Sequence, residues 1–580
     1  MDFAGNIYNV ARWTNEVPYK SEVVIDTETT FVDGPITPEL VLFQAYFGGD
    51  TAYYVKKCDL PAFFDKYKKS TLIFHNASFD VEVLCSYFKD RNFFFEYFDQ
   101  GRVKDTRILW QLYHLAVEGF VPHRSSLAFL METIFQIELE KDADVRHTFE
   151  QYLYTDEDNI GKDHMEYALK DVIATHMLYK KLSLHVGEIG NAQQLSHSIQ
   201  AAGSLALDRI YKRGIGFDLN KANEFKQKLE KRIDKIGDKL AIYGWVRGIP
   251  GSKDAYSRNI DRLGLCLPKT ENGDVSSKEE DLLPYKEKHE FIRCYLEYHA
   301  LEKTKSFIDN IKTPRVHPRY QLLKNTGRTS CTGSKHGACN IQQLPRDGEI
   351  RSLFVPKEGH SFIITDYSAI ELSALAQVTY SQFKESKMRD LINEGRDLHK
   401  YAASQIYKVD EKDVDKSQRL LAKILNFGLG ANMSHKTFVD YAKGFGVELS
   451  EDEAFDLKNK WTAIFPEMKK YWDIGGEFGS TFTHSTLTGR IRAKASYTAY
   501  LNTGFQGLAA DGAKIALFYL DKEGVDIVAF VHDEIVSEVP NENIEKYLKL
   551  QETIMVKGMR QVIPDVEVRV ESQITDHYCK

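Results

Sequence analysis

Three apolar segments of this chain, residues 23–25, 362–364 and 527–531, lead into acidic side chains. Short apolar runs of this kind are typical of buried strands, and a strand that ends in a carboxylate holds that charge in a fixed place. Such a charge costs free energy unless a metal ion or a cationic partner lies beside it. The pattern therefore predicts an α/β chain whose strands deliver carboxylates to charged functional sites.

The size of the chain allows several domains. Its 580 residues exceed what one hydrophobic core usually organises, and the usual domain size indicates about 3–5 units. Hydrophobic residues make up 43% and charged residues 28%, so neither a disordered nor a fibrous chain is indicated. We predict an α/β multidomain protein.

Composition also restricts the compartment and the partners. The N-terminus lacks the apolar core of a signal peptide, and no apolar stretch of about 18 residues follows, so we expect no membrane segment. The seven cysteines include no CxxC pair, which argues against disulfides and zinc and favours a reducing cytoplasm. The net charge of −8 argues mildly against a protein that coats nucleic acid, although local basic stripes can still bind DNA.

Residue spacing predicts the elements of the first half. Residues 21–55 have the alternation and turn residues of a three-stranded meander. Residues 76–185 have helical spacing around one further short strand, so an α/β domain is expected to end near residue 190. Residues 219–243 and 285–312 are long charged amphipathic patterns, which predict a projecting helical arm.

The second half is predicted to be mixed. A strand is expected at 361–366, helices through most of 370–475, and a hairpin near 524–539. This arrangement places two of the acidic strand ends in one part of the chain.

Acidic residues of the first domain predict a metal site. Asp26 and Glu28 lie two residues apart on a strand, so the pleat points both to one face. Asp80 opens a helix, and Tyr167 and Asp171 share a helical face at a spacing of four. Phosphodiester hydrolysis by two metal ions about 3.5–4 Å apart needs such oxygen ligands. Singly, each acid is more often a solvated surface group, but the ordered combination favours a nuclease.

The order of these motifs resembles that of the DEDD exonuclease family in its tyrosine-containing branch. The resemblance implies an RNase H-like fold and 3′→5′ exonuclease activity over residues 1–190. It also implies that four carboxylates bind metal, namely Asp26, Glu28, Asp80 and Asp171, and that Tyr167 positions the attacking water.

The second acidic set predicts nucleotidyl transfer. Asp366 ends an apolar strand, and Asp533 and Glu534 lie at a tight turn between two apolar runs. Two Mg²⁺ ions held by a pair of aspartates can activate a primer 3′-hydroxyl and neutralise charge on a triphosphate. Asp366 and Asp533 are the expected pair.

A helical stripe between these acids predicts a phosphate contact. Arg419, Lys423 and Phe427 recur at a spacing of four, so two cations can meet phosphates beside an aromatic stacking surface. Alone, the stripe would more often be an ordinary solvated helix with one buried Phe.

These segments resemble motifs A, B and C of family A (Pol I-type) DNA polymerases, in order. Further matching motifs are Thr326–Arg328, Asn340–Arg346, Asp397–His399 and Asn502–Gly507. The resemblance covers about residues 195–580 and implies a right-hand polymerase domain of phage or bacterial type. The implied divisions of residues 191–580 are a thumb near 195–315, a palm near 320–372 and 480–580, and fingers near 373–479.

The resemblance also implies residue roles. Lys423 would protonate the leaving pyrophosphate, Glu371 would exclude a ribonucleotide 2′-hydroxyl, and Glu534 would be an auxiliary acid. The residues expected to contact the nucleotide are Arg419, Lys423, His399, Phe427, Glu371 and Tyr367. The residues expected to contact metal are Asp366, Asp533 and Tyr367. The residues expected to contact primer–template are Arg328, Arg346, Gln506, Asn502 and His532.

Two positions depart from the family pattern. Members usually have a tyrosine four residues beyond the position of Phe427, where this chain has Ala431, so fidelity cannot be carried over. The link at 329–339 is longer than usual. Its Cys331, His336 and Cys339 make only three metal ligands, so a DNA-facing loop is favoured over a metal site.

The expected function is template-directed DNA synthesis with proofreading, in replication or repair. Expected cofactors are Mg²⁺ ions, two per site, with Mn²⁺ as a substitute. Expected partners are primer–template DNA, dNTPs and unidentified processivity or replisome proteins, with a monomeric chain in the cytoplasm of a bacterial cell or phage-infected host. Two alternatives are an exonuclease on an inactive polymerase-like scaffold and a non-enzymatic DNA-binding protein.

Overall fold

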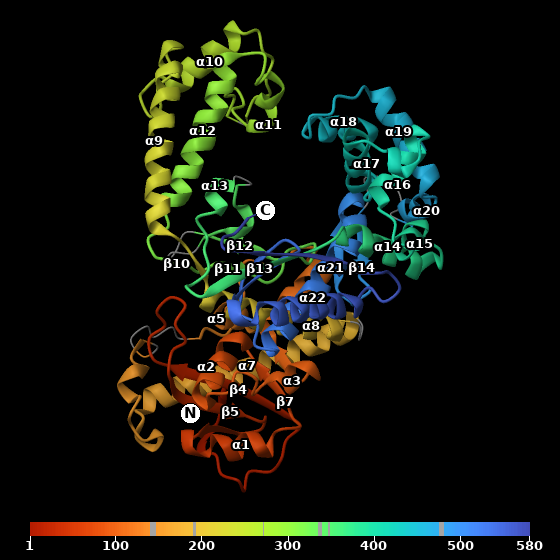
Figure 1. Cartoon of the computed structure of the whole chain (residues 1–580). Coiled ribbons are helices and arrows are strands. Elements are labelled where there is room, and N and C mark those ends of the chain that lie inside the picture. The colour runs from red at the N-terminus through yellow and green to blue at the C-terminus, as the bar shows by residue number, and fades with distance from the viewer. Residues whose placement is uncertain are drawn as a thin grey trace.

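The computed structural model describes residues 1–139, 145, 147–189, 193–270, 272–333, 339–345, 348–474 and 481–579. A compact N-terminal part lies at the bottom of Figure 1, a central sheet with long helices lies above it, and two helical projections rise from that layer. Among the described residues, no helix combines the length and the apolar character needed to cross a membrane.

The N-terminal part contains a six-stranded sheet in the order β3-β6-β5-β4-β7-β8. The antiparallel strands β4, β5 and β6 confirm the predicted meander. The one further short strand predicted within residues 76–185 is confirmed as β8. Strands β3 and β7 lie outside that range, form parallel pairs and were not predicted, because they are too short to show in the sequence. The strands are β3 (Asn9–Arg12), β4 (Glu22–Thr29), β5 (Leu40–Tyr46), β6 (Thr51–Val55), β7 (Thr71–Phe74) and β8 (Val103–Asp105).

Helices cover this sheet and bury its apolar residues on two sides. They are α1 (Leu60–Lys66), α2 (Ala77–Phe88), α3 (Phe95–Asp99), α4 (Thr106–Glu118), α5 (Leu127–Phe135) and α7 (Lys162–Ile189). The following helix, α8 (Gln193–Arg213), contributes Leu205 to the same apolar cluster, and Phe518 from the far end of the chain joins it. The N-terminal core therefore continues into the C-terminal part.

The predicted arm consists of two long helices, α9 (Leu219–Ile242) and α12 (Glu290–Asp309), which form the left projection in Figure 1. On α9, Phe225, Leu229 and Ile233 are buried at helical spacing, as expected for a helix that packs along one apolar stripe. The shorter α10 (Ser252–Arg262) and α11 (Glu279–Leu282) lie between these two helices in the chain.

The central sheet has the antiparallel order β16-β17-β13-β18. Strands β16 (Ile527–Val531) and β17 (Glu534–Pro540) confirm the predicted hairpin, and β13 (His360–Tyr367) confirms the predicted strand. The edge strand β18 (Val570–Thr575) was not predicted. The long helices α21 (Tyr497–Lys522) and α22 (Ile544–Arg560) pack together beside the sheet.

The right projection in Figure 1 is helical, as predicted for 370–475. Its helices are α14 (Ile370–Phe383), α15 (Lys387–Asn393), α16 (Leu398–Tyr407), α17 (Lys416–Leu429), α18 (His435–Lys443), α19 (Glu451–Ile464) and α20 (Glu467–Ile474). Asp415 and Gln418 form a capping box at the start of α17, which fixes where this helix begins.

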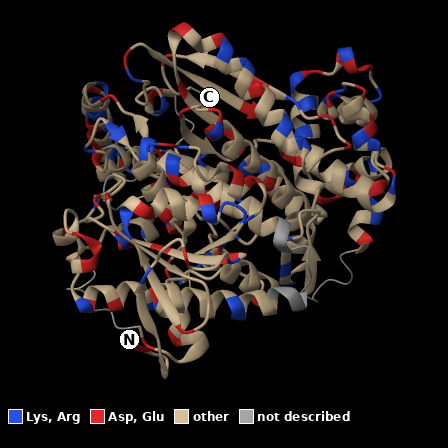
Figure 2. Ribbon diagram, turned by 90° about the horizontal axis from the view of Figure 1, so that it is seen from below, with Lys and Arg blue, Asp and Glu red and all other residues tan. Residues whose placement is uncertain are grey.

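Smaller pieces complete the fold. The remaining described strands and the short helix are β1 (Asp2–Phe3), β2 (Asn6–Ile7), β9 (Ile215–Gly216), β10 (Arg315–Val316), β11 (Arg319–Gln321), β12 (Ser330–Thr332), β14 (Phe482–Ser485), β15 (Ile491–Ala495) and α13 (Gly348–Arg351). Figure 2 shows basic and acidic residues interspersed along the ribbon.

Candidate active sites

Three carboxylates of the N-terminal part meet at one point. One carboxylate oxygen from each of Asp26, Glu28 and Asp171 lies within 4.8 Å of the others. Asp26 and Glu28 come from alternate positions of β4, and Asp171 comes from α7, which packs against β4. Hard oxygen donors at this separation fit one or two divalent cations.

The fourth predicted carboxylate, Asp80, lies on α2, is 2% exposed and is not part of this group of three among the described residues. The Thr27 amide and hydroxyl donate to Asp80 Oδ1 at 3.0 and 2.7 Å. Burial nevertheless raises the pKa of Asp80 to about 7. Burial, together with the charges of Asp80, Glu28 and Asp171, raises the pKa of Asp26 well above its ordinary value. A bound cation would remove this repulsion, so the residues fit a metal site.

Tyr167 lies one turn before Asp171 on α7, as predicted. Its ring centroid is 6.1 Å from that of the buried Phe149. Packing against Phe149 restricts the phenol, which suits a group that orients water.

The sequence did not reveal the residues that position α2. Asp105 accepts the Asn76 and Ala77 amides at 3.2 and 2.8 Å, so it holds the start of the helix that carries Asp80. Its own amide donates to Nε2 of His197 on α8 at 3.1 Å. Burial lowers the pKa of His197 to about 4, so its ring is neutral and can accept.

The second acidic set lies at one end of the central sheet. Asp366 on β13 pairs in register with Glu534 on β17, so both side chains leave the same face. Asp533 lies one residue earlier, in the two-residue turn that joins β16 to β17. His532 in this turn has φ of 60°, and hairpin turns of this length require positive φ. Glu534 is buried and accepts the Tyr578 hydroxyl at 2.8 Å.

Arg328 places a positive charge near this acidic end of the sheet. The Arg328 guanidinium pairs with Glu371 in the first turn of α14. Burial lowers the pKa of Arg328, and the charge of Asp533 counteracts part of that effect. Two predicted substrate contacts are therefore paired with each other.

A buried network holds the turn before Arg328, and the sequence did not reveal it. The fully buried guanidinium of Arg490 pairs with Asp511 at 2.6 Å. A Cβ atom at Gly327 would lie 2.2 Å from Arg490 Nη2, so only glycine fits there. Lys514 donates to the Gly327 carbonyl at 2.8 Å. These contacts fix the backbone that presents Arg328.

The predicted stripe of α17 faces outward. Lys423 is exposed and Phe427 is 37% exposed, while Arg419 donates to Asp397 at 2.9 and 3.0 Å. His399 packs at 5.7 Å from the Phe427 ring. Burial lowers the pKa of His399 to about 4, so its ring is neutral near pH 7 in the chain without a ligand.

The remaining predicted residues differ in accessibility. Asn502 and Gln506 are half-buried one turn apart on α21, and His532 is exposed. Tyr367 is buried, and its hydroxyl donates to the Met555 carbonyl at 2.8 Å. Because the side chain is occupied in this way, the predicted metal contact of Tyr367 would have to come from its main-chain carbonyl. Arg346 lies outside the described residues.

The two departures from the family pattern have structural counterparts. Cys331 and Cys339 are buried, and the Cys331 thiol donates to the Cys339 carbonyl at 3.2 Å. They face a core, while His336 lies outside the described residues. Ala431 is buried just beyond α17, and the neighbouring Asn432 donates to the Tyr497 hydroxyl at 2.6 Å.

The fold and the two acidic sites define a chain that joins a nuclease-type domain to a polymerase-type domain. Residues 220–580 match the family described as DNA polymerase family A, and residues 7–186 match the family described as 3'-5' exonuclease. The chain therefore belongs to DNA polymerase family A and carries an N-terminal exonuclease domain.

Curated relatives of this chain include DNA polymerases I of bacteria. DNA polymerase I of Aquifex aeolicus is 34% identical over 378 residues, covering 62% of this chain and 62% of the relative. DNA polymerase I of Geobacillus stearothermophilus is 29% identical over 402 residues, covering 63% and 43%. This chain thus spans less than two thirds of the length of these relatives.

The fold also matches a solved structure. The POL domain of Pol1 from M. smegmatis, in complex with DNA primer-template and dNTP, superposes with a TM-score of 0.75 at 19% identity. The match covers 98% of this chain and 99% of that chain. It establishes a common fold.

Proposed function

We propose that this chain copies a DNA template from a primer 3′ end and removes mispaired nucleotides with a separate 3′→5′ exonuclease. The observation that carries this proposal is the presence of two acidic sites in two domains, each with the ligand chemistry of phosphoryl transfer. Membership of family A and the exonuclease match support it.

At the polymerase site, the proposed metal ligands are Asp366 and Asp533. When bound, two divalent ions activate a 3′-hydroxyl and neutralise triphosphate charge. The exposed Lys423 ammonium on α17 can bind the triphosphate and donate a proton to the departing pyrophosphate. Arg419, held by Asp397, presents a second cation to the phosphates.

Specificity for deoxynucleotides is proposed to depend on Glu371. Arg328 holds this carboxylate at the start of α14, beside the end of β13. A carboxylate at the sugar's 2′ position would exclude a hydroxyl by contact and by charge. Arg328, Asn502, Gln506 and His532 are proposed to contact primer–template, as is Arg346.

At the exonuclease site, Asp26, Glu28, Asp80 and Asp171 are the proposed metal ligands, and Tyr167 is proposed to orient the attacking water. Mg²⁺ is the proposed ion at both sites, with Mn²⁺ as a substitute. We also propose a monomer that works in the cytoplasm of a bacterial cell or phage-infected host and accepts accessory replication proteins.

Primer extension tests the polymerase assignment. The unmodified chain should extend a primed template with dNTPs and Mg²⁺, should fail with EDTA, and should incorporate ribonucleotides poorly. Glu371→Ala should admit ribonucleotides, because it removes the group that faces the 2′ position. Hydrolysis of a single strand without any extension would instead support an exonuclease on an inactive scaffold.

A further inference from the structure

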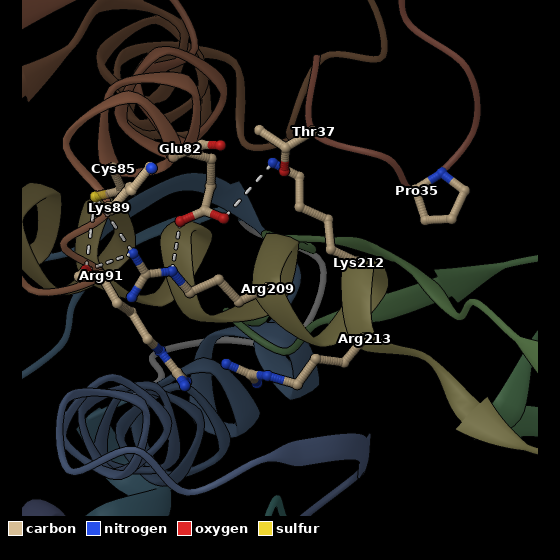
Figure 3. A pocket seen from close by; sticks show the side chains of 10 residues that line it. Pro35, Thr37, Glu82, Cys85, Lys89, Arg91, Arg209, Lys212 and Arg213 are labelled. Atoms are coloured by element: carbon tan, nitrogen blue, oxygen red, sulfur yellow. Dashed lines mark hydrogen bonds and ion pairs between the residues drawn. The ribbon is translucent and has the colours of Figure 1, made fainter. Parts of the chain in front are cut away.

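A cavity of about 560 Å³ lies where the N-terminal domain meets α8 (Figure 3). Pro35 and Thr37 line one side, in the loop that continues from β4 after Glu28. Helix α2, which carries Asp80, lines the second side, and the end of α8 lines the third. The cavity therefore adjoins elements of the exonuclease site and the helix that leads to the thumb arm.

The lining of this cavity is strongly basic. One carboxylate, Glu82, lines it against five cationic side chains, which are Lys89, Arg91, Arg209, Lys212 and Arg213. Cations that share one concave wall produce a positive potential inside the cavity, because low-dielectric walls focus the field. This excess favours an anionic ligand.

The carboxylates that pair with these cations lie on both sides of the wall. Glu82 lines the cavity and pairs with Arg209 and Lys212, and Asp526, whose side chain is 43% exposed, pairs with Arg91 and Arg213. Asp521 is 2% exposed and does not line the cavity. It pairs with Arg91, Arg209 and Arg213 together, and the Arg213 contact measures 2.5 Å. Three guanidiniums on one recessed carboxylate are held in place. Such preorganisation suits recognition of phosphate groups. The further pairs of these guanidiniums with Asp526 and Glu82 neutralise part of their charge, so the positive excess of the lining is smaller than its five cations alone would give.

Two lysines have unused donor capacity at the cavity. Lys212 Nζ is 3.1 Å from Asp208 and 3.7 Å from Glu82, but makes no well-formed hydrogen bond among the described residues. Lys89 is exposed and has no ion-pair partner in the described part of the chain. Figure 3 shows Lys212 and Arg209 extending from α8 toward Glu82 on α2.

We propose that this cavity binds backbone phosphates of single-stranded DNA. The inference deepens the proposed function, since a primer end that leaves the polymerase site must cross to the exonuclease domain as a single strand. A cation-lined cavity between α2 and α8 would hold that strand through its phosphates without reading its bases. A free anion such as pyrophosphate can bind through the same cations, so the experiment distinguishes phosphates of a DNA strand from a free anion.

The test measures binding of a labelled oligothymidylate to the full chain in EDTA, by fluorescence anisotropy, at several salt concentrations. The double variant Lys89→Ala/Lys212→Ala should bind more weakly. For this variant, the slope of the logarithm of the DNA-binding constant against the logarithm of the salt concentration should fall in magnitude by about 1.4. Each phosphate contact on a single strand contributes about 0.7 to that slope, and the variant loses two. Glu82→Gln should bind more tightly, because it removes the carboxylate that lines the cavity.

Lys546→Ala/Lys549→Ala is the matched control, since it removes the same charge from exposed sites on α22. It should leave the salt slope unchanged. Thermal unfolding of each variant checks the fold. An unchanged slope in Lys89→Ala/Lys212→Ala would overturn the proposal.

A lysine-dependent stabilisation by pyrophosphate, without any change in DNA binding, would also overturn it in favour of a free anion. Extension and hydrolysis by the unmodified chain are measured separately, so failure of the cavity and failure of the proposed function are distinguishable.

Discussion

The two acidic sites handle their charge in different ways. In the N-terminal domain, carboxylates from β4, α2 and α7 crowd together, and burial with mutual repulsion raises the pKa of Asp26 and Asp80. In the polymerase domain, Asp366 and Asp533 lie at one end of a sheet. There the cation Arg328, which pairs with Glu371, lies near Asp533. The first site needs a metal ion to be fully ionised, whereas the second has a cationic side chain beside its acids.

The largest expected effect separates the two sites. Asp533→Ala should lower extension by about 10³-fold or more, because the metal-held geometry of nucleotidyl transfer is lost. It should leave single-strand hydrolysis within about twofold, because the exonuclease carboxylates remain in place. Asp26→Ala should do the reverse. Rates of extension and of hydrolysis on matched oligonucleotides measure both. Loss of both activities in a folded Asp26→Ala variant would contradict two independent sites.

A smaller effect is expected at the cationic side of the polymerase site. Lys423→Ala should slow nucleotide incorporation by about 10²-fold, since it removes a proton donor and a phosphate contact. Hydrolysis should not change. Single-turnover extension over a range of dNTP concentrations measures this, and exposed Lys412→Ala is the control. Equal losses in both lysine variants would show that Lys423 acts only through surface charge.

The pH dependence should distinguish the exonuclease site. The pKa of Asp80 in the folded chain is about 7, above the value of an unfolded aspartate. In the absence of metal, the contribution of the Asp80 carboxyl to folding stability is therefore complete at low pH, where the group is protonated. This contribution is lost as the pH rises through about 7. Metal binding needs the ionised form, so stabilisation by Mg²⁺ should grow between about pH 6 and pH 8. Melting temperatures with and without Mg²⁺ measure this. Asp80→Asn should weaken the trend, and the part that remains should come from Asp26, whose pKa is also raised.

The smallest effect concerns the support of Asp80. Thr27→Val removes the hydroxyl that donates to Asp80 at 2.7 Å but keeps the amide donor. A hydrogen bond to a charged group contributes about 1.5–3 kcal/mol. The pKa of Asp80 should therefore rise further, and the Mg²⁺ concentration for half-maximal hydrolysis should increase about tenfold or more. Extension should remain normal; a fall in extension would indicate general destabilisation.

The sequence predicted the parts of both sites that depend on local spacing. The alternation of Asp26 and Glu28, the helical pair Tyr167 and Asp171, and the 527–539 hairpin all follow from the period of one strand or helix. The relation of Asp80 to Thr27 could not be predicted, because it joins segments 53 residues apart.

What the sequence could not predict is support that comes from distant segments. Asp105 with His197, and Arg490 with Asp511, look like ordinary charged or polar residues in the linear pattern. Their contacts arise only when α8, α4 and α21 pack. The edge strand β18 was missed for the same reason, since it pairs with a strand more than 200 residues earlier in the chain.

Helix α8 has a consequence for any attempt to divide this chain. Its Leu205 lies in the apolar cluster of the nuclease domain, its His197 supports that domain's carboxylate helix, and its Gln200 donates to Asp511 in the polymerase domain at 2.9 Å. If the chain were divided before α8, the nuclease domain would lose the α8 side chains that pack in it. If it were divided after α8, the polymerase domain would lose its contacts with that helix. Exchange of the nuclease domain for that of a relative would therefore have to transplant α8 with it, or redesign both of the surfaces that it covers.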